Sequence, residues 1–544
     1  MKSGHERTLD SPIPWSGEHR VKDWMRLHGE LAACVAVVVV FVIRIVAARG
    51  RYLSPDEALH VEAASAPSMI GVYENSRFLA HPPLFFLLLH FWLLAGRSEF
   101  FLRSLSAVFG VGVLLFARRW AGHLFGWTAG LTTLFLVAFS PAFLPLSAEV
   151  RGYSLLLFLS AAALAEFEGA LEGRSSARMV GSSLLLFLAI LTHFAALFIT
   201  MSLFVYALAR FWSDRPPRRV LRIWAISQAG AAALYLFLYS TQVARLRGTE
   251  AVQTLTGPLA SSYFHPDRET APGFLVRQTA ALSRYLFGSR AAAAVVVVLA
   301  AAGVVSLALK RRPSAVLLVL PCFLGAAFGL AALYPFGGTR HSVYVLPFAG
   351  AAVGAAVSAF SVKRIRVLLS GIALLPLLWG RPDWSSPPES LSRAEAAIDR
   401  LRSIAPRGSL LLTDGQTGAV LGYYFGAHGS SAPRSREYRM VRSPVWASDP
   451  EKIGEEVERL IRIYRLSAGQ RFWMIRLGLE RDPTAALARQ FPAALFSVVG
   501  RFGDIFIVEV RLRDSPGKRG DLTGDEPNAP LDDVQLTPSR GFVT

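Results

Sequence analysis

Long apolar runs separated by short polar segments fill residues 31–380 of the chain. A helix needs about 20 apolar residues to cross a bilayer, and about 17 is the lower limit. The run 179–211 is too long for one span and breaks at Thr192-His193, so it predicts two short spans. The other predicted spans are 31–48, 104–120, 127–146, 153–168, 220–240, 291–309, 314–333, 343–360 and 366–380. The pattern thus predicts a polytopic α-helical membrane protein with about 11 transmembrane helices.

One apolar segment, Leu84 to Leu94, is shorter than a span and follows His81-Pro82-Pro83. Apolar runs of about 10–14 residues are more often interfacial or re-entrant than spanning. Counting this segment as a span would also move every later loop to the opposite side. We therefore expect residues 60–103 to lie on the outer surface as amphipathic segments.

The distribution of Lys and Arg predicts the orientation, because positively charged loops stay in the cytoplasm. One set of loops holds 20 Lys and Arg in 71 residues, and the other holds 13 in 121. The richer set comprises 1–30, 118–126, 169–178, 210–222, 310–312 and 361–366. The N-terminal segment 1–30 is therefore predicted to be cytoplasmic, in an inner or plasma membrane. An odd number of spans places the region after residue 380 in the periplasm or outside the cell.

The chain changes character after residue 380, where alternating and helical patterns replace the long apolar runs. We expect helices at 393–404, 418–425, 451–464 and 485–491, and strands at 409–413, 472–476 and 505–512. These elements predict a small extracytoplasmic α/β domain over 381–513. Residues 514–544 are polar and rich in Pro, Gly and Asp, which is typical of a disordered tail.

Composition agrees with a membrane protein. The chain is 53% hydrophobic and 18% charged, with a mean hydropathy of +0.39, whereas soluble domains carry more charge. The net charge of +18 follows from the loop asymmetry, and a basic patch on a soluble domain, typical of nucleic-acid binding, is not apparent. Cys34 and Cys322 both fall inside predicted spans, so a disulfide framework is excluded, and no metal-ligand spacing occurs.

Four polar stretches fall on the predicted outer face, where they could form one site. They are Ser54-Pro55-Asp56-Glu57, His81-Pro82-Pro83-Leu84, Glu149-Val150-Arg151-Gly152-Tyr153, and the stretch from Arg340-His341 to Leu346-Pro347. Adjacent carboxylates beside a bilayer can act as a general base, bind a cation or simply be solvated. Arginine suits a phosphate group, since its planar fork binds phosphate oxygens in pairs.

In this order the stretches resemble the motifs of integral-membrane GT-C glycosyltransferases of the protein O-mannosyltransferase type (glycosyltransferase family 39). Lipid A aminoarabinose transferases belong to the same group. Members carry an Asp-Glu pair in the first external loop, then His-Pro-Pro-Leu, Glu-Ala-Arg-x-Tyr, Thr-His-Tyr/Phe and an Arg-Tyr stretch before Leu-Pro. The Thr-His-Phe stretch here is Thr192-His193-Phe194. The chain departs from the family at Val150, where Ala is usual, and at His341, where Tyr is common. The resemblance covers residues 31–380, and the C-terminal domain matches no family that we can name.

The resemblance implies a GT-C fold with the Asp-Glu motif in the external loop 49–103. It also implies a hexosyl or pentosyl transferase of the inverting type. Such an enzyme moves a sugar from a polyprenyl-phosphate donor to a lipid, glycan or protein acceptor on the external face of the membrane. A hydroxyl acceptor needs a base, and the departing phosphate needs a cation.

These requirements assign roles to the candidate residues. Asp56 is expected to be the general base, and Glu57 to support it or contact the acceptor. Arg151 and Arg340 are expected to hold the donor phosphate, although either could instead be an interfacial anchor. Other candidate substrate-binding residues are His81, Glu149, Tyr153, His193 and His341. His81 could instead cap a helix, His193 could be a packing residue, and Glu149 could serve only to orient Arg151.

No cofactor is certain from the sequence. Asp56, Glu57 and a donor phosphate could hold a divalent cation, but two carboxylates with arginine nearby do not require one.

The main alternative from another class is a polytopic transporter or a flippase for lipid-linked sugars. Such proteins place ionisable residues within their spans, near the bilayer midplane. In this chain Arg44 is the only charge deep inside a predicted span, and the notable residues gather at the external boundary. A membrane scaffold is a second alternative, but it would not need Asp56, Arg151 and Arg340 together.

Overall fold

A computed structural model describes most of the chain. The described residues are 29–31, 33–43, 46, 52–79, 81–246, 257–360, 371, 390–427, 438–443, 450–476, 484–503 and 505–513. Four predicted features lie wholly or mostly outside them: the N-terminal segment 1–30, the span 366–380 apart from residue 371, Arg44, and the tail 514–544.

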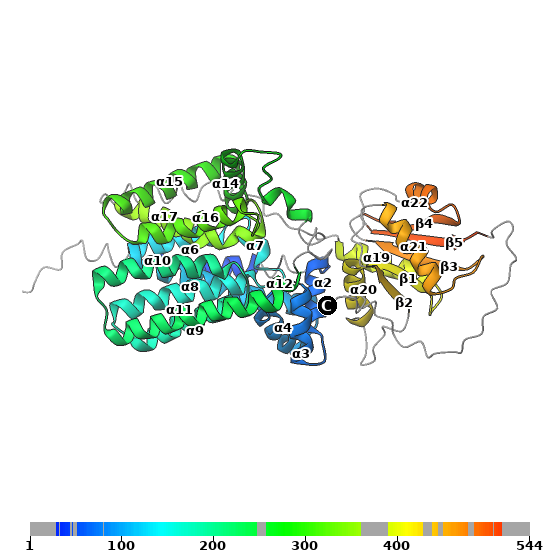
Figure 1. Cartoon of the computed structure of the whole chain (residues 1–544), viewed down its shortest axis with the longest axis horizontal. Helices are drawn as coiled ribbons and strands as arrows, with labels where there is room; N and C mark the ends of the chain where they lie inside the picture. The colour runs from blue at the N-terminus through cyan, green and yellow to red at the C-terminus, as the bar shows by residue number, and fades with distance from the viewer. Residues whose placement is uncertain are drawn as a thin grey trace, which may run out of the picture.

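The first two-thirds of the chain fold into a bundle of long helices, which run side by side (Figure 1). Six helices among the described residues are long and apolar enough to cross a membrane, judged by length and composition. They are Glu99–Phe125 (α5), Tyr153–Glu172 (α8), Ala196–Asp214 (α10), Arg218–Val243 (α11 with a π-helical turn), Arg290–Leu309 (α15) and Arg340–Ala359 (a 3-10 turn η3 with α17). The protein is therefore a multi-pass membrane protein.

Shorter apolar helices complete the bundle. They are Gly29–Ile43, Leu84–Ala95 (α4), Trp127–Ala138 (α6), Ser176–Ile190 (α9) and Ser314–Leu330 (α16). The break expected at Thr192-His193 is present between α9 and α10. The predicted span 127–146 instead divides into α6 and the short helix Phe143–Leu146 (α7), with Pro141 between them. Proline cannot donate a backbone hydrogen bond, which favours an interruption there.

The bundle is closed at one end by three short helices, Pro55–Ala64 (α2), Met69–Phe78 (α3) and α4 (Figure 1). The helix α4 has 12 residues and is therefore about 18 Å long at 1.5 Å per residue, too short to cross a bilayer core of about 30 Å. Several apolar side chains of α3 and α4 are exposed, including Ile70 and Leu94. This arrangement fits the expectation of surface-lying segments.

The C-terminal part contains a five-stranded sheet with the order β2-β1-β3-β5-β4. The strands are Leu410–Asp414 (β1), Arg439–Ser443 (β2), Arg471–Arg476 (β3), Ala494–Phe502 (β4) and Ile505–Leu512 (β5). Strand β1 pairs in parallel with β2 and β3, while β5 runs antiparallel to β3 and β4. The sequence pattern predicts β1, β3 and β5 but not β2 or β4.

Helices cover both faces of this sheet. They are Ser390–Ile404 (α19), Gly415–Ala427 (α20), Pro450–Ile463 (α21) and Thr484–Gln490 (α22). Alternate side chains of a strand point to opposite faces. Leu410 and Leu412 accordingly join the core that holds Leu460 of α21, while Leu411 joins the core that holds Leu401 of α19.

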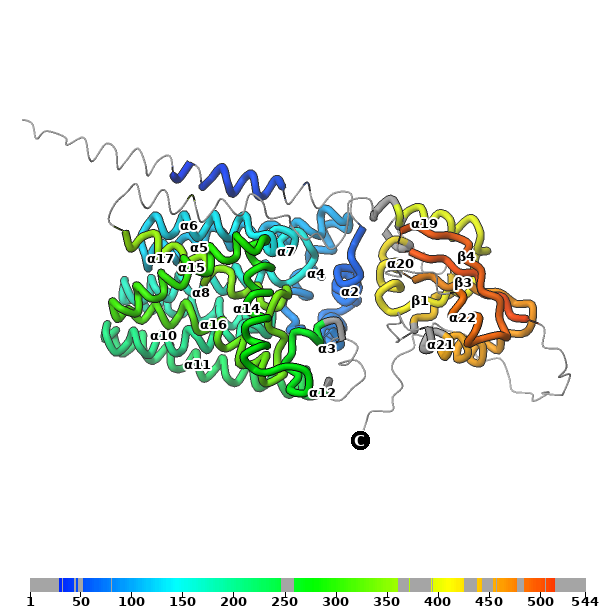
Figure 2. The backbone as a smooth tube through the Cα atoms, turned by 90° about the horizontal axis from the view of Figure 1, so that it is seen from above, coloured from blue at the N-terminus to red at the C-terminus, as the bar shows by residue number. Residues whose placement is uncertain are grey.

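The C-terminal part meets the bundle through helix α20, which packs against α2 (Figures 1 and 2). The Leu53 N–H donates to the Tyr424 hydroxyl at 3.0 Å. The Tyr423 hydroxyl donates to the carbonyl of Arg97, and Arg442 pairs with Glu62. The contact therefore lies directly beside the Asp-Glu pair.

Candidate active site

The Asp-Glu pair lies in the first turn of α2, and the local sequence explains why the helix begins there. Ser54 is the N-cap, and its hydroxyl accepts a hydrogen bond from the Glu57 N–H at 3.3 Å. The Glu57 carboxylate in turn accepts from the Ser54 N–H at 2.9 Å. This reciprocal capping box, with Pro55 at the first helical position, fixes the start of the helix. Consecutive helical residues lie about 100° apart, so the two carboxylates face different surroundings.

Glu57 is buried and fully engaged. Arg103 of α5 donates to both of its carboxylate oxygens at 2.9 Å, and the Val150 N–H donates to one of them at 3.0 Å. Burial alone would raise the pKa of Glu57, but Arg103 and these hydrogen bonds lower it to about 2. Arg103 also donates to the carbonyl of Tyr52 at 3.0 Å. Glu57 thus ties α2, α5 and the loop before α8 together, which favours positioning over contact with a substrate.

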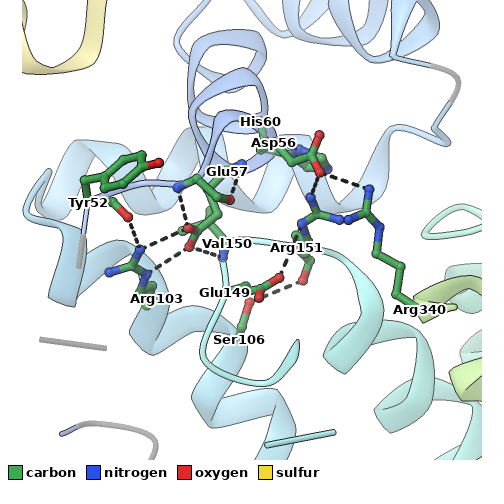
Figure 3. A network of polar contacts seen from close by, with 11 residues as sticks. Tyr52, Asp56, Glu57, His60, Arg103, Ser106, Glu149, Val150, Arg151 and Arg340 are labelled. Carbon is green, nitrogen blue, oxygen red and sulfur yellow. Dashed lines mark hydrogen bonds and ion pairs between the residues drawn. The ribbon is translucent and has the colours of Figure 1, made fainter. Parts of the chain in front are cut away.

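Asp56 faces the other way and receives two arginines (Figure 3). Arg151 forms an ion pair with its Oδ2, and Arg340 donates to the same oxygen at 2.9 Å. Burial would raise the pKa of Asp56, but the two guanidinium groups hold it well below its usual range. The Asp56 side chain keeps 31% of its surface exposed, so it remains accessible.

The loop before α8 supplies Glu149, Arg151 and Tyr153. Arg151 is almost fully buried, and its Nε lies 3.5 Å from a carboxylate oxygen of Glu149. The hydroxyl of Ser106 donates to the carbonyl of Arg151 at 3.2 Å. Although burial opposes the charge, Asp56 and Glu149 raise the pKa of Arg151 above its usual value. This arginine is therefore held in place from both sides.

Four histidines and a tyrosine form a chain of neighbouring rings beside Arg151. The ring centroids of His60 and His81 are 5.4 Å apart, and those of His81 and His193 are 5.6 Å apart. His341 lies 6.1 Å from His193, and Tyr153 lies 5.0 Å from His193. The structure thus gathers His81, Tyr153, His193 and His341, which the sequence analysis selected separately.

His60 is a member of this cluster that sequence reasoning missed. It lies one helical turn after Asp56, and its Nδ1 is 2.6 Å from the Asp56 carbonyl oxygen. Its spacing of four residues from Asp56 places both on one face of α2, and this was the available signal. Burial and the nearby Arg151 lower the pKa of His60 to about 4, and burial and Arg340 lower that of His193 to about 3. Burial also lowers the pKa of His81.

Metal binding has no support from a ligand cluster in the described part of the chain. No group of three or more His, Cys, Asp or Glu side chains there is arranged to hold a metal ion. Both arginines contact the same oxygen of Asp56, Oδ2.

The fold and the site define a class: a multi-pass membrane protein with charged groups gathered at one end of its helical bundle. No protein-family model matches the chain, and no curated protein matches it. Among solved structures, ArnT from Cupriavidus metallidurans bound to undecaprenyl phosphate matches with a TM-score of 0.55 at 15% identity. The match covers 88% of this chain and 97% of that chain.

Two further solved structures show similarity. The same ArnT in the apo state matches with a TM-score of 0.54 at 14% identity, over 90% of this chain and 98% of that chain. The oligosaccharyltransferase of Archaeoglobus fulgidus in complex with zinc and sulfate matches with a TM-score of 0.49 at 14% identity, over 86% of this chain and 72% of that chain. At these identities the likeness to ArnT establishes the fold. The resemblance to GT-C glycosyltransferases, first seen in short motifs, is confirmed at this level.

Proposed function

We propose that this protein is a glycosyltransferase that moves a sugar from a polyprenyl-phosphate donor to an acceptor on the external face of the membrane. The observation that carries the proposal is the meeting of Arg151 and Arg340 on one oxygen of Asp56. Such a pair of guanidiniums next to an accessible carboxylate supplies both requirements of the reaction, a cation for phosphate and a base. ArnT, which has the same fold, has been solved with undecaprenyl phosphate bound.

In the structure both arginines are held by Asp56, whose lowered pKa makes it a weak base. We propose that the donor phosphate takes the arginines from Asp56. The pKa of Asp56 then rises toward its usual value, because the two arginines bind the phosphate instead. Asp56 would become an effective base only when the donor is in place.

The proposed transfer is a single displacement. The acceptor oxygen forms a bond to the anomeric carbon, the bond from that carbon to the phosphate oxygen breaks, and the acceptor proton passes to Asp56. The polyprenyl phosphate leaves, and Arg151 and Arg340 stabilise its negative charge. Glu57 and Glu149 are engaged with arginines, so neither is placed as a second free carboxylate to act as nucleophile. One displacement inverts the configuration of the anomeric carbon, which fits the inverting reaction that we expect.

The acceptor is a lipid, a glycan or a protein, and the sugar is a hexose or a pentose. The proposal places the N-terminus in the cytoplasm and residues 381–513 outside it. A transporter or flippase, the main alternative, would move the lipid-linked sugar without breaking the bond between sugar and phosphate.

The test is sugar transfer by the purified full-length protein supplied with a radiolabelled undecaprenyl-phosphate sugar and extracted membranes as acceptor. We expect label to move from the polyprenyl lipid to a second product. Asp56→Asn keeps the size and removes the charge, so transfer should fall by about 100-fold or more. Asp267→Asn is the control, since that side chain lies in an exposed loop. Translocation of intact donor across vesicles without new products would favour the flippase and contradict the proposal.

A further inference from the structure

A small pocket opens beside Arg151, with space for about one water molecule. Apolar rings form part of the wall, and the ring of Phe86 stacks on that of His60 at 5.0 Å between centroids. The lining residues with polar side chains are His60, His81, Arg151, Tyr153, Thr192 and His193. The pocket is thus too small to enclose a whole sugar ring, but it can admit one polar group at the edge of a ring.

Backbone contacts fix where the ring protons lie on two of the histidines. The Ala195 N–H donates to Nδ1 of His193 at 3.1 Å, so the uncharged ring carries its proton on Nε2. Nε2 of His193 is buried and has no hydrogen-bond partner in the described part of the chain. His60 is the reverse case. Its Nδ1 faces the Asp56 carbonyl, which only accepts, so Nδ1 carries the proton and Nε2 is left as an acceptor.

Among the polar groups that line the pocket beside Arg151, His193 offers an unpaired donor and His60 an acceptor. Burial and the arginines lower the pKa of both rings far below neutrality, so both are uncharged at pH 7. A hydroxyl accepts one hydrogen bond and donates another, so it satisfies both. An ammonium group donates only and leaves the buried His193 donor unpaired.

We propose that this pocket recognises a hydroxyl group on the sugar of the donor and rejects a donor with an amine at that position. The inference rests on the proposed function, which places the donor phosphate on Arg151. Because Arg151 also lines the pocket, a sugar joined to that phosphate can reach the pocket with its edge. His193 and His60 would then select neutral sugars by matching a hydroxyl.

The test measures equilibrium binding to the full-length protein in lipid nanodiscs. The probes are undecaprenyl phosphate, an undecaprenyl-phosphate hexose, and a series of that hexosyl donor in which each hydroxyl in turn is removed or replaced by an amine. We expect His193→Ala to bind the hexosyl donor about 10-fold more weakly, because a buried hydrogen bond is lost. It should bind undecaprenyl phosphate as the wild type does. His193→Gln places an amide donor near the position of Nε2 and should restore part of the loss.

One deoxy donor should bind the wild type about 10-fold more weakly than the intact donor, with no further loss in His193→Ala, as expected for two changes that remove the same contact. The amine at that position should bind no better. His90→Ala is the control, since His90 bonds to the Ala64 carbonyl and does not line the pocket.

Failure of the inference and failure of the proposed function give different results. If the wild type binds neither undecaprenyl phosphate nor the hexosyl donor, the proposed function fails and the inference falls with it. If both bind, but His193→Ala lowers the affinity for every deoxy donor as much as the affinity for the intact donor, the pocket does not recognise a hydroxyl. An equal loss of affinity for undecaprenyl phosphate in His193→Ala also overturns the inference, because the effect would then belong to the phosphate site.

Discussion

Asp56 and Glu57 are neighbours in the chain, but their carboxylates have different partners. Glu57 accepts hydrogen bonds from Arg103, Ser54 and Val150 and is buried. Asp56 forms ion pairs with Arg151 and Arg340 and stays partly exposed. The angle of about 100° between successive helical residues separates a positioning residue from a candidate catalytic one.

Replacement of the arginines tests the proposed phosphate site. Arg151→Lys and Arg340→Lys keep the charge but lose the paired hydrogen-bond fork, so we expect donor binding about 10-fold weaker. Arg151→Ala and Arg340→Ala should cost about 100-fold in turnover, since charge on the leaving phosphate is greatest in the transition state. Binding of undecaprenyl phosphate and the turnover number measure the two effects. The control is Arg268→Ala in an exposed loop. Wild-type values in both alanine variants would show that Arg151 and Arg340 do not hold the phosphate and act only as interfacial anchors.

The buried Glu57–Arg103 pair should make stability depend on pH. The pKa of Glu57 is lowered from 4.5 to about 2 in the folded protein. Its contribution is therefore fully present above pH 4.5 and is lost as pH falls toward 2. Glu57→Gln should destabilise the protein by about 3–5 kcal/mol near neutral pH, because it leaves Arg103 buried without its carboxylate. The measurement is thermal unfolding in detergent, in which the gap between the two proteins should narrow on acidification. A gap that does not change with pH would show that the charge of Glu57 is not responsible.

At the scale of elements, helix α20 supports the start of α2. The Tyr424 hydroxyl accepts from the Leu53 N–H, just before the N-cap Ser54. Arg103 holds the carbonyl of Tyr52 on the same segment. The loop that precedes the Asp-Glu pair is thus held both by the bundle and by the C-terminal part.

Tyr424→Phe removes only the hydroxyl and leaves the buried Leu53 N–H unsatisfied. We expect turnover to fall about 10-fold with little change in the KM for donor, since a small displacement of a catalytic group slows the reaction without removing phosphate contacts. Tyr438→Phe is the matched control, because the Tyr438 hydroxyl bonds to the Ala405 carbonyl within the C-terminal part. Steady-state kinetics of both variants separate the two constants. Equal kinetics for Tyr424→Phe and wild type would show that α20 does not position the site.

At the scale of the whole molecule, the site lies at the end of the bundle that faces the C-terminal part (Figures 1 and 2). The site and the C-terminal part must therefore lie on the same side of the membrane. The excess of Lys and Arg in the opposite loops predicts that this side is extracytoplasmic.

Reporter fusions test this orientation. A reporter placed after Arg381 should read as external, and one within 215–219 should read as cytoplasmic. The expected result follows from the Lys and Arg of the loop 210–222 and from an odd number of spans before residue 381. If both reporters lie on the same side, the number of spans between them differs by one from our prediction.

Features that depend on local physics could be predicted from the order of residues alone. Apolar runs long enough to cross a bilayer form helices because a helix satisfies its backbone hydrogen bonds within the segment, and α5, α8 and α15 occupy predicted runs. The Ser54 to Glu57 capping box that begins α2 is also a local feature, since its partners are close in the chain, although it was not among the predictions. Short motifs in order also indicated the GT-C resemblance.

Which of the candidate residues lie together depends on the packing of distant segments. Arg340 reaches Asp56 across 284 residues of sequence, and no local pattern determines such a pair, because it depends on how whole helices pack. Packing also pairs Glu57 with Arg103 and places His60 beside His81 in the histidine cluster. Strand β2 likewise becomes a strand through β1, whose hydrogen bonds come from a segment outside its own sequence. Strand β4 pairs with β5, the next strand along the chain, so its partner is local, although its own pattern does not predict a strand.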